Sequence, residues 1–141
     1  MQQVDALPPP QRLIRIIYVE DDALMADIVK DLLTNAGYLV GVIGHGTLAY
    51  DTIAFKKPDL VILDRALPGM QGIEILQRLR ATPHTYLMPV LMLTATGSEQ
   101  NIDEGLGFGA DGYLVKPFDP TVLLQKVASI LDNSLFNRSA R

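Results

Sequence analysis

The chain has 141 residues, of which 48% are hydrophobic and 20% charged, and this length suits one globular domain rather than two. Its formal net charge is −4 and its basic residues form no long run, which argues against nucleic acid as a direct partner. The absence of cysteine excludes thiol catalysis, disulfides and thiolate metal sites, so any metal must be held mainly by oxygen. No segment approaches the roughly 20 apolar residues of a membrane span, so no membrane partner is expected and the chain is predicted to be cytoplasmic.

Two polar end segments, residues 1–11 and 132–141, are predicted to be tails, and residues 12–131 are predicted to form the folded domain. Within this domain, apolar runs of strand length alternate with segments of helical period. The predicted strands cover residues 13–19, 38–43, 60–63, 90–93 and 113–115. Most of them are apolar on both faces, which is typical of a parallel sheet covered by helices on each side.

A helix is predicted after each of these strands. The first carries Leu24, Ile28 and Leu32 at four-residue spacing and ends at a glycine, Gly37. The others cover residues 48–55, 73–80, 99–108 and 122–131, the last opened by Asp119 and Pro120. The alternation predicts an α/β fold, a flavodoxin-like (βα)₅ doubly wound parallel sheet with strand order 2-1-3-4-5.

Polar side chains follow four of the predicted strands. Glu20, Asp21 and Asp22 follow the first strand, and Asp64 the third. Thr94 follows the fourth strand, and Lys116 with Pro117 follows the fifth. In the expected strand order these four strands are neighbours, so their carboxyl ends should bring these side chains into one pocket.

Carboxylates from two adjacent strands repel one another unless a cation neutralises them. Mg²⁺ prefers octahedral oxygen coordination with one or two carboxylates and a phosphate oxygen, which suits Asp21, Asp64 and an incoming phosphoryl donor. Lys116 would add a compact positive charge on the same oxygens. Asp64 is then the expected nucleophile, and an aspartyl phosphate the expected product.

Four sequence blocks resemble those of a response-regulator receiver domain of two-component signalling, in particular the stand-alone chemotaxis regulators. They are IIYVEDD, DRALPGMQG with the phosphoacceptor, VLMLTA with a switch hydroxyl, and DGYLVKPF. Each block is weak alone, but all four occur in this order with each key residue at a predicted strand end. The resemblance runs from about Arg15 to Leu131.

The resemblance implies a ligand set for Mg²⁺. Asp21 and Asp64 would bind the ion directly, Glu20 would act through water, and the backbone carbonyl of Ala66 would complete the protein ligands. Asp22 would be the flanking member of the acidic group.

The resemblance also implies a switch. Thr94 would hydrogen-bond one phosphoryl oxygen and Lys116 would pair with another, with a cis bond before Pro117. Tyr113 would change rotamer when Thr94 moves inward, and this would reshape the surface around the fourth helix and fifth strand.

The expected function is a phosphoacceptor switch in a two-component system or phosphorelay. The donor would be a histidine kinase or a histidine phosphotransfer protein, and the output a contact with a downstream protein. No output domain fits in the tails, so a stand-alone receiver is expected. Such a protein would catalyse only its own aspartyl phosphorylation and dephosphorylation, and would not be an enzyme acting on an external substrate.

Three other functions share parts of this pattern. A flavodoxin-like FMN carrier needs a phosphate-binding loop after the first strand, where this chain has three acidic residues. A phosphohydrolase with an aspartate nucleophile usually has a second acid two residues later, where this chain has Ala66. A pseudo-receiver that serves as a docking scaffold usually lacks Asp64 or Lys116, and both are present.

Several of these residues also have ordinary structural explanations. An acidic group after a strand can cap the next helix, and a threonine often ends a strand simply because it is a good strand former. Arg65 departs from the family, whose residue after the phosphoacceptor is usually less basic. It could tune Asp64, contact a partner, or lie on the surface.

Overall fold

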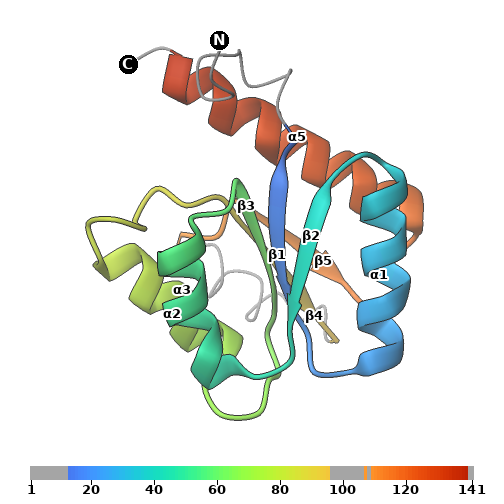
Figure 1. The fold of residues 1–141 in the computed structure, drawn as a ribbon, viewed down its shortest axis with the longest axis horizontal. Helices are drawn as coiled ribbons and strands as arrows, with labels where there is room; N and C mark the ends of the chain where they lie inside the picture. The colour runs from blue at the N-terminus through green and yellow to red at the C-terminus, as the bar shows by residue number, and fades with distance from the viewer. Residues whose placement is uncertain (1–12, 96–106, 108, 140–141) are drawn as a thin grey trace, which may run out of the picture.

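Five parallel strands form one sheet in the order β2-β1-β3-β4-β5, as Figure 1 shows for this computed structural model. The structure describes residues 13–95, 107 and 109–139. The strands are β1 (Arg15–Val19), β2 (Leu39–Ile43), β3 (Leu60–Asp64), β4 (Val90–Thr94) and β5 (Gly112–Val115). The helices are α1 (Ala23–Asn35), α2 (Gly46–Lys56), α3 (Gly72–Ala81) and α5 (Pro120–Ser139). The predicted fold class and strand order are confirmed.

The helices lie on both faces of the sheet, with α1 and α5 on one side and α2 and α3 on the other (Figure 1). Alternate residues of a strand point to opposite faces, so β1 contributes Ile16 and Tyr18 to the first core and Ile17 and Val19 to the second. Strands β3 and β4 are buried along their whole length. The central strands are therefore fixed by packing on two sides, which gives their carboxyl ends defined positions.

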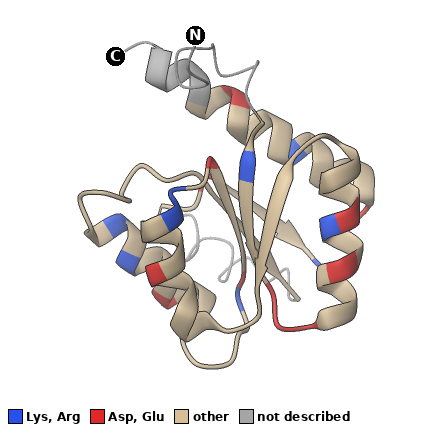
Figure 2. Cartoon of the chain, in the orientation of Figure 1, with Lys and Arg blue, Asp and Glu red and all other residues tan. Residues whose placement is uncertain are grey.

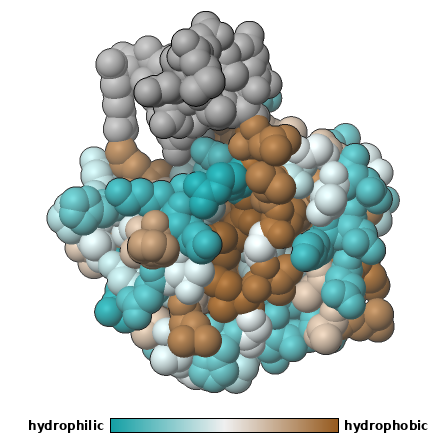
Figure 3. All heavy atoms as spheres, viewed as in Figure 1, coloured by the Kyte–Doolittle hydropathy of each residue, from teal (hydrophilic) through white to brown (hydrophobic). Residues whose placement is uncertain are grey.

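Strand β2 lies at the edge of the sheet and is largely exposed. Leu39 is 51% exposed, and Figure 3 shows an apolar band along this side of the molecule. The strand carries no charge and no proline, the usual features that discourage pairing with a second strand.

Capping residues set the helix boundaries close to the predicted ones. Asp22 caps α1, with its Oδ1 accepting a hydrogen bond of 3.1 Å from the Met25 N–H, and Gly37 follows the helix with a φ of 101°. Asp119 opens α5 in the same way, with its Oδ1 2.7 Å from the Thr121 nitrogen.

Three of the predicted segments either lie outside the described residues or differ from the prediction. The helix predicted at 99–108 lies outside the described residues except for Gly107, and so does the predicted tail 1–11. The prediction that 132–141 forms a tail is wrong for most of that segment, because α5 continues to Ser139. Its polar composition suggested a tail, but it contains no glycine or proline to stop a helix. Within the described part of the chain, no helix is long and apolar enough to cross a membrane.

The loops that follow β2 and β3 support one another beside the carboxyl edge of the sheet. The Gly46 N–H donates to the Pro68 carbonyl at 3.0 Å, and a side chain at Gly46 would overlap the backbone of Met70. Gly69, with a φ of 79°, lies against the side chains of His45 and Thr47. The β3 loop that begins at Asp64 is thus held by the start of α2.

We expect Gly46→Ala to lower the free energy of unfolding by about 1–3 kcal/mol, because the new methyl group has no space against the Met70 backbone. Gly41→Ala is the matched control, since a Cβ at Gly41 meets nothing within 4 Å, and its effect should stay within about 1 kcal/mol. Urea denaturation of the two variants measures the difference. Equal stability of both would contradict the close packing of these loops.

Candidate functional site

The carboxyl ends of four neighbouring strands bring the predicted site residues together. Glu20 follows β1, Asp64 ends β3, Thr94 ends β4 and Lys116 follows β5. The backbone N–H of Lys116 donates to the Thr94 carbonyl at 2.6 Å. Figure 2 shows the acidic turn between β1 and α1 at this same edge. The predicted convergence is therefore present.

The ammonium of Lys116 bridges two carboxylates at the centre of the site. Its Nζ lies 2.7 Å from Glu20 Oε1 and 3.0 Å from Asp64 Oδ2. Glu20 is 2% exposed and Asp64 6% exposed, so both acids are buried charges that need a partner. The Ala66 N–H donates to the other Asp64 oxygen, Oδ1, at 3.2 Å. Each oxygen of Asp64 therefore has a defined neighbour.

Glu20 has a second strong donor that the sequence analysis did not anticipate. The hydroxyl of Tyr18, a fully buried residue of β1, donates to Glu20 Oε1 at 2.8 Å. The available signal was the spacing, because residues two apart on a strand share a face. The sequence alone does not point to this contact, because a tyrosine in a buried strand is an ordinary core residue.

The two buried carboxyls titrate as a coupled pair. The pKa of Asp64 is raised from 3.8 to about 6, mainly by burial and then by Glu20, while Lys116 offsets part of this rise. Burial acts to raise the pKa of Glu20 as well, but hydrogen bonds from Asp64, Lys116 and Tyr18 favour its ionised form and lower its pKa overall. Glu20 is thus the first of the pair to ionise, and Asp64 keeps a proton up to about pH 6.

The two donors to Glu20 keep their protons. Burial acts to lower the pKa of Lys116, but its contacts with Glu20 and Asp64 dominate and raise it. Burial raises the pKa of Tyr18 far above its ordinary value, and the hydrogen bond to Glu20 adds to the rise. Both groups therefore act as hydrogen-bond donors at neutral pH.

Three carboxylates form an acidic cluster that fits a hard divalent cation. Oxygen atoms of Glu20, Asp21 and Asp64 all lie within 4.8 Å of one another, with Asp21 exposed to solvent. Lys116 neutralises only part of this charge, and carboxylate oxygens are the ligands that Mg²⁺ prefers. The oxygen set and its excess negative charge thus match the predicted type of ion.

The sequence profile of the response regulator receiver domain matches residues 16–128. The chain belongs to the response regulator receiver family. Members of this family are phosphoacceptor switches of two-component systems, so the predicted family and general function are confirmed.

Similar proteins include complete regulators and single receivers. The DNA-binding response regulator MtrA of Mycobacterium tuberculosis is 41% identical over 117 residues, which are 83% of this chain and 50% of that protein. This receiver thus spans about half the length of that relative. The chemotaxis response regulator CheY4 of Vibrio cholerae is 31% identical with a TM-score of 0.79, covering 84% of this chain and 99% of that one. A CheY-like receiver domain protein of Methanospirillum hungatei is 32% identical with a TM-score of 0.80, covering 87% and 97%.

The two residues expected to form the switch of the receiver are both buried. Thr94 is 1% exposed at the end of β4, and Tyr113 of β5 packs in the core beneath α2 and α3. The Tyr113 hydroxyl has no hydrogen-bond partner among the residues that the structure describes. The peptide bond between Lys116 and Pro117 is cis, as predicted.

Two of the remaining polar residues near the site of the receiver cap helices, and a third, Arg65, is fixed through its backbone. Asp22, the flanking acid, caps α1 through its side chain. Arg65 is half-buried after β3, where its backbone N–H donates to the Leu93 backbone carbonyl at 2.8 Å, and the role of its side chain remains a prediction. His45 caps α2, with its Nδ1 accepting from the Thr47 N–H at 3.3 Å.

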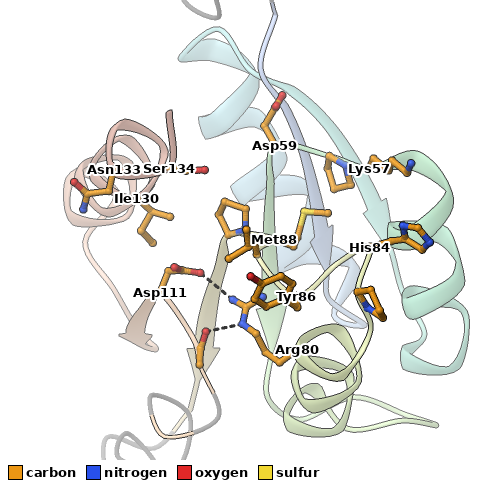
Figure 4. A pocket seen from close by; sticks show the side chains of 15 residues that line it. Lys57, Asp59, Arg80, His84, Tyr86, Met88, Asp111, Ile130, Asn133 and Ser134 are labelled. Atoms are coloured by element: carbon orange, nitrogen blue, oxygen red, sulfur yellow. Dashed lines mark hydrogen bonds and ion pairs between the residues drawn. The ribbon is translucent and has the colours of Figure 1, made fainter. Parts of the chain in front are cut away.

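A cavity of about 690 Å³ lies at the opposite edge of the receiver's sheet (Figure 4). Its lining includes Asp59, Pro89 and Asp111, which precede β3, β4 and β5. Arg80 crosses it, with bonds to the Gly109 carbonyl at 2.9 Å and to Asp111 at 3.0 Å. None of the residues in the acidic cluster lines this cavity, so it is separate from the candidate site.

We expect Asp64→Asn to stabilise the receiver in EDTA at pH 8, by on the order of 2 kcal/mol, because one pKa unit corresponds to about 1.4 kcal/mol. A raised carboxyl pKa means that the folded state holds the proton more tightly than the unfolded state. The contribution of Asp64 to stability is thus fully present below pH 3.8 and is lost as the pH rises through about 6. The gain from Asp64→Asn should therefore shrink at pH 5.

Urea denaturation of both proteins at pH 5 and pH 8, with EDTA present, measures this effect. Asp51→Asn, at an exposed position of α2, is the control and should show no such pH-dependent gain. A gain for Asp64→Asn that is equal at the two pH values would show that the buried carboxyl is not the cause.

Proposed function

We propose that this receiver accepts a phosphoryl group on Asp64 from a phosphohistidine donor. The observation that carries the proposal is the buried Asp64 carboxyl at a strand end, 3.0 Å from the Lys116 ammonium and inside an acidic cluster. A buried acid with a perturbed pKa beside a positive charge is typical of a reactive carboxylate. Membership of the receiver family makes phosphoryl transfer its expected chemistry.

The reaction requires Mg²⁺ in this proposal. Asp21, Asp64 and the Ala66 carbonyl would hold the ion, and Glu20 would act through a bound water. When bound, Mg²⁺ would neutralise the clustered carboxylates and stabilise negative charge on the phosphoryl oxygens.

Asp64 would act as the nucleophile. One carboxylate oxygen attacks phosphorus in line, the new O–P bond forms as the P–N bond of the donor breaks, and the imidazole leaves with the electron pair of that bond. Lys116 already lies 3.0 Å from Asp64 Oδ2, so a small movement transfers its ammonium from the carboxylates to a phosphoryl oxygen.

The acyl phosphate would then act as the signal. The Thr94 hydroxyl would bond a phosphoryl oxygen, and Tyr113 would follow it, which shifts the protein between two states. The hydroxyl of Tyr113 supports such a role, since a buried hydroxyl without a described partner gains energy by moving to one.

The proposed partners are a histidine kinase or a histidine phosphotransfer protein as the donor and a downstream protein as the target, with no contact to nucleic acid or membrane by this domain. Such a donor would place the receiver in the cytoplasm. The receiver would catalyse only its own phosphorylation and dephosphorylation and would have no external substrate.

Incubation with Mg²⁺ and acetyl phosphate or phosphoramidate should add one phosphoryl group, measured by intact-mass spectrometry. The adduct should be labile to hydroxylamine, as an acyl phosphate is, and absent with EDTA. It should also be absent in Asp64→Asn, which keeps the shape of the side chain but lacks the nucleophilic oxygen. No adduct on the wild type, together with no spectral change on adding beryllofluoride, would instead favour a docking scaffold that keeps the pocket without using it.

We expect the Thr94→Ala variant still to accept the phosphoryl group on Asp64 but to lose most of the rotamer change of Tyr113. Amide NMR spectra of the beryllofluoride-bound protein test this, because the signals of β5 should move in the wild type and stay nearly fixed in Thr94→Ala. Thr94→Ser keeps the hydroxyl and should behave as the wild type does. Equal shifts in all three proteins would refute the role of this hydroxyl.

A further inference from the structure

Tyr18 brings a polar group from the core of the domain to the candidate site. Its side chain is fully buried, with its ring packed in the core beneath α1 and α5. Its hydroxyl donates to Glu20 Oε1 at 2.8 Å, and the same oxygen accepts from Lys116 Nζ at 2.7 Å. One carboxylate oxygen is therefore held by two donors, one neutral and one charged.

Among the residues that the structure describes, Glu20 is the hydrogen-bond partner of the Tyr18 hydroxyl. An aromatic ring without it would fill the same space in the core, because the ring makes the apolar contacts. The residue is inaccessible to solvent, so bulk water cannot replace the hydroxyl as a donor to Glu20. The contact is thus specific for holding the Glu20 carboxylate.

The two oxygens of Glu20 are in different surroundings. Oε1 accepts from both Tyr18 and Lys116, whereas the Asp22 N–H donates to Oε2 over a long distance of 3.4 Å, and Asp64 also hydrogen-bonds the carboxylate. A contact of this length is weak, so Oε2 keeps its capacity to accept a further hydrogen bond. One oxygen of the same carboxylate lies within 4.8 Å of oxygens of Asp21 and Asp64, so Glu20 itself is part of the acidic cluster.

We propose that Tyr18 is a positioning residue for the Mg²⁺ site: its hydroxyl fixes the Glu20 carboxylate so that Oε2 can accept a hydrogen bond from water bound to the ion. This inference rests on the proposed function, which assigns Mg²⁺ to the cluster. Partners that orient the acids around a metal commonly change its affinity by about 10- to 100-fold when they are removed.

Tyr18 matters most after Lys116 moves. In the proposed reaction, Lys116 leaves the carboxylates to pair with the phosphoryl group, and Glu20 Oε1 then loses its charged donor. Tyr18 is a fully buried residue of β1, so its hydroxyl can keep its bond to Glu20 when Lys116 leaves. A single neutral donor thereby holds Glu20 in both states of the site.

Mg²⁺ titrations followed by amide NMR test this role in the unphosphorylated chain. Tyr18→Phe should raise the Mg²⁺ dissociation constant about tenfold while leaving the amide spectrum of the core unchanged. Tyr50→Phe is the matched control, because the Tyr50 hydroxyl donates an equally short bond, 2.8 Å to Thr82 Oγ1, away from the acidic cluster. Tyr50→Phe should bind Mg²⁺ as the wild type does.

A double-variant comparison shows whether Tyr18 acts through Glu20. In a Glu20→Ala background, Tyr18→Phe should cause no further change in Mg²⁺ affinity, because the carboxylate that it positions is gone. An equal loss in both backgrounds would mean that Tyr18 acts through packing, and the proposal would be wrong. It would also be wrong if Tyr18→Phe alone bound Mg²⁺ within a factor of about two of the wild type.

The wild-type titration separates this inference from the function on which it rests. If the wild type shows no Mg²⁺ binding, the proposed function and this inference fail together. If the wild type binds and Tyr18→Phe binds equally well, only the positioning role fails.

Discussion

The site depends on the way one ammonium group is shared between two buried carboxyls. Glu20 and Asp64 come from different strands, and neither charge would be tolerated in the core without compensation. The ammonium of Lys116 lies 2.7 Å from a Glu20 oxygen and 3.0 Å from an Asp64 oxygen, so it partly neutralises both carboxylates. Lys116 follows a third strand, β5. The compensation is incomplete, which leaves Asp64 with a raised pKa and the cluster with an affinity for a further cation.

The fold creates this arrangement because the strands are parallel. Their carboxyl ends lie at one edge of the sheet, and the burial of β3 and β4 on both faces allows little freedom in where those ends lie. The adjoining loops add a second constraint, since Gly46 and the Pro68 carbonyl bind the start of α2 to the loop that carries Ala66. Precise side-chain positions at the edge thus follow from rigid packing behind it.

Most of the fold and the composition of the site could be predicted from the sequence, because the signals are local. Apolar runs predict the strands, and Gly37 and Asp119 mark helix ends that the structure confirms. The sequence prediction ended the last helix at residue 131, because residues 132–141 are polar like a tail. The helix continues to Ser139, since that segment has no glycine or proline to stop it. The contacts of Glu20 with Tyr18 and Lys116 could not be predicted, since the choice of hydrogen-bond partner depends on side-chain geometry across strands. The roles of Asp21, Ala66, Thr94 and Tyr113 remain predictions for the experiments.

At the opposite edge of the sheet, where the strands begin, a different carboxylate, Asp111, holds the elements together. Arg80 at the end of α3 bonds Asp111 before β5, and the same Asp111 oxygen accepts from the Val90 N–H of β4 at 2.8 Å. One carboxylate therefore joins a helix and two strands at their amino ends. Loss of the Asp111 carboxylate would therefore release α3, β4 and β5 from one another at once, at the edge of the sheet away from the acidic cluster.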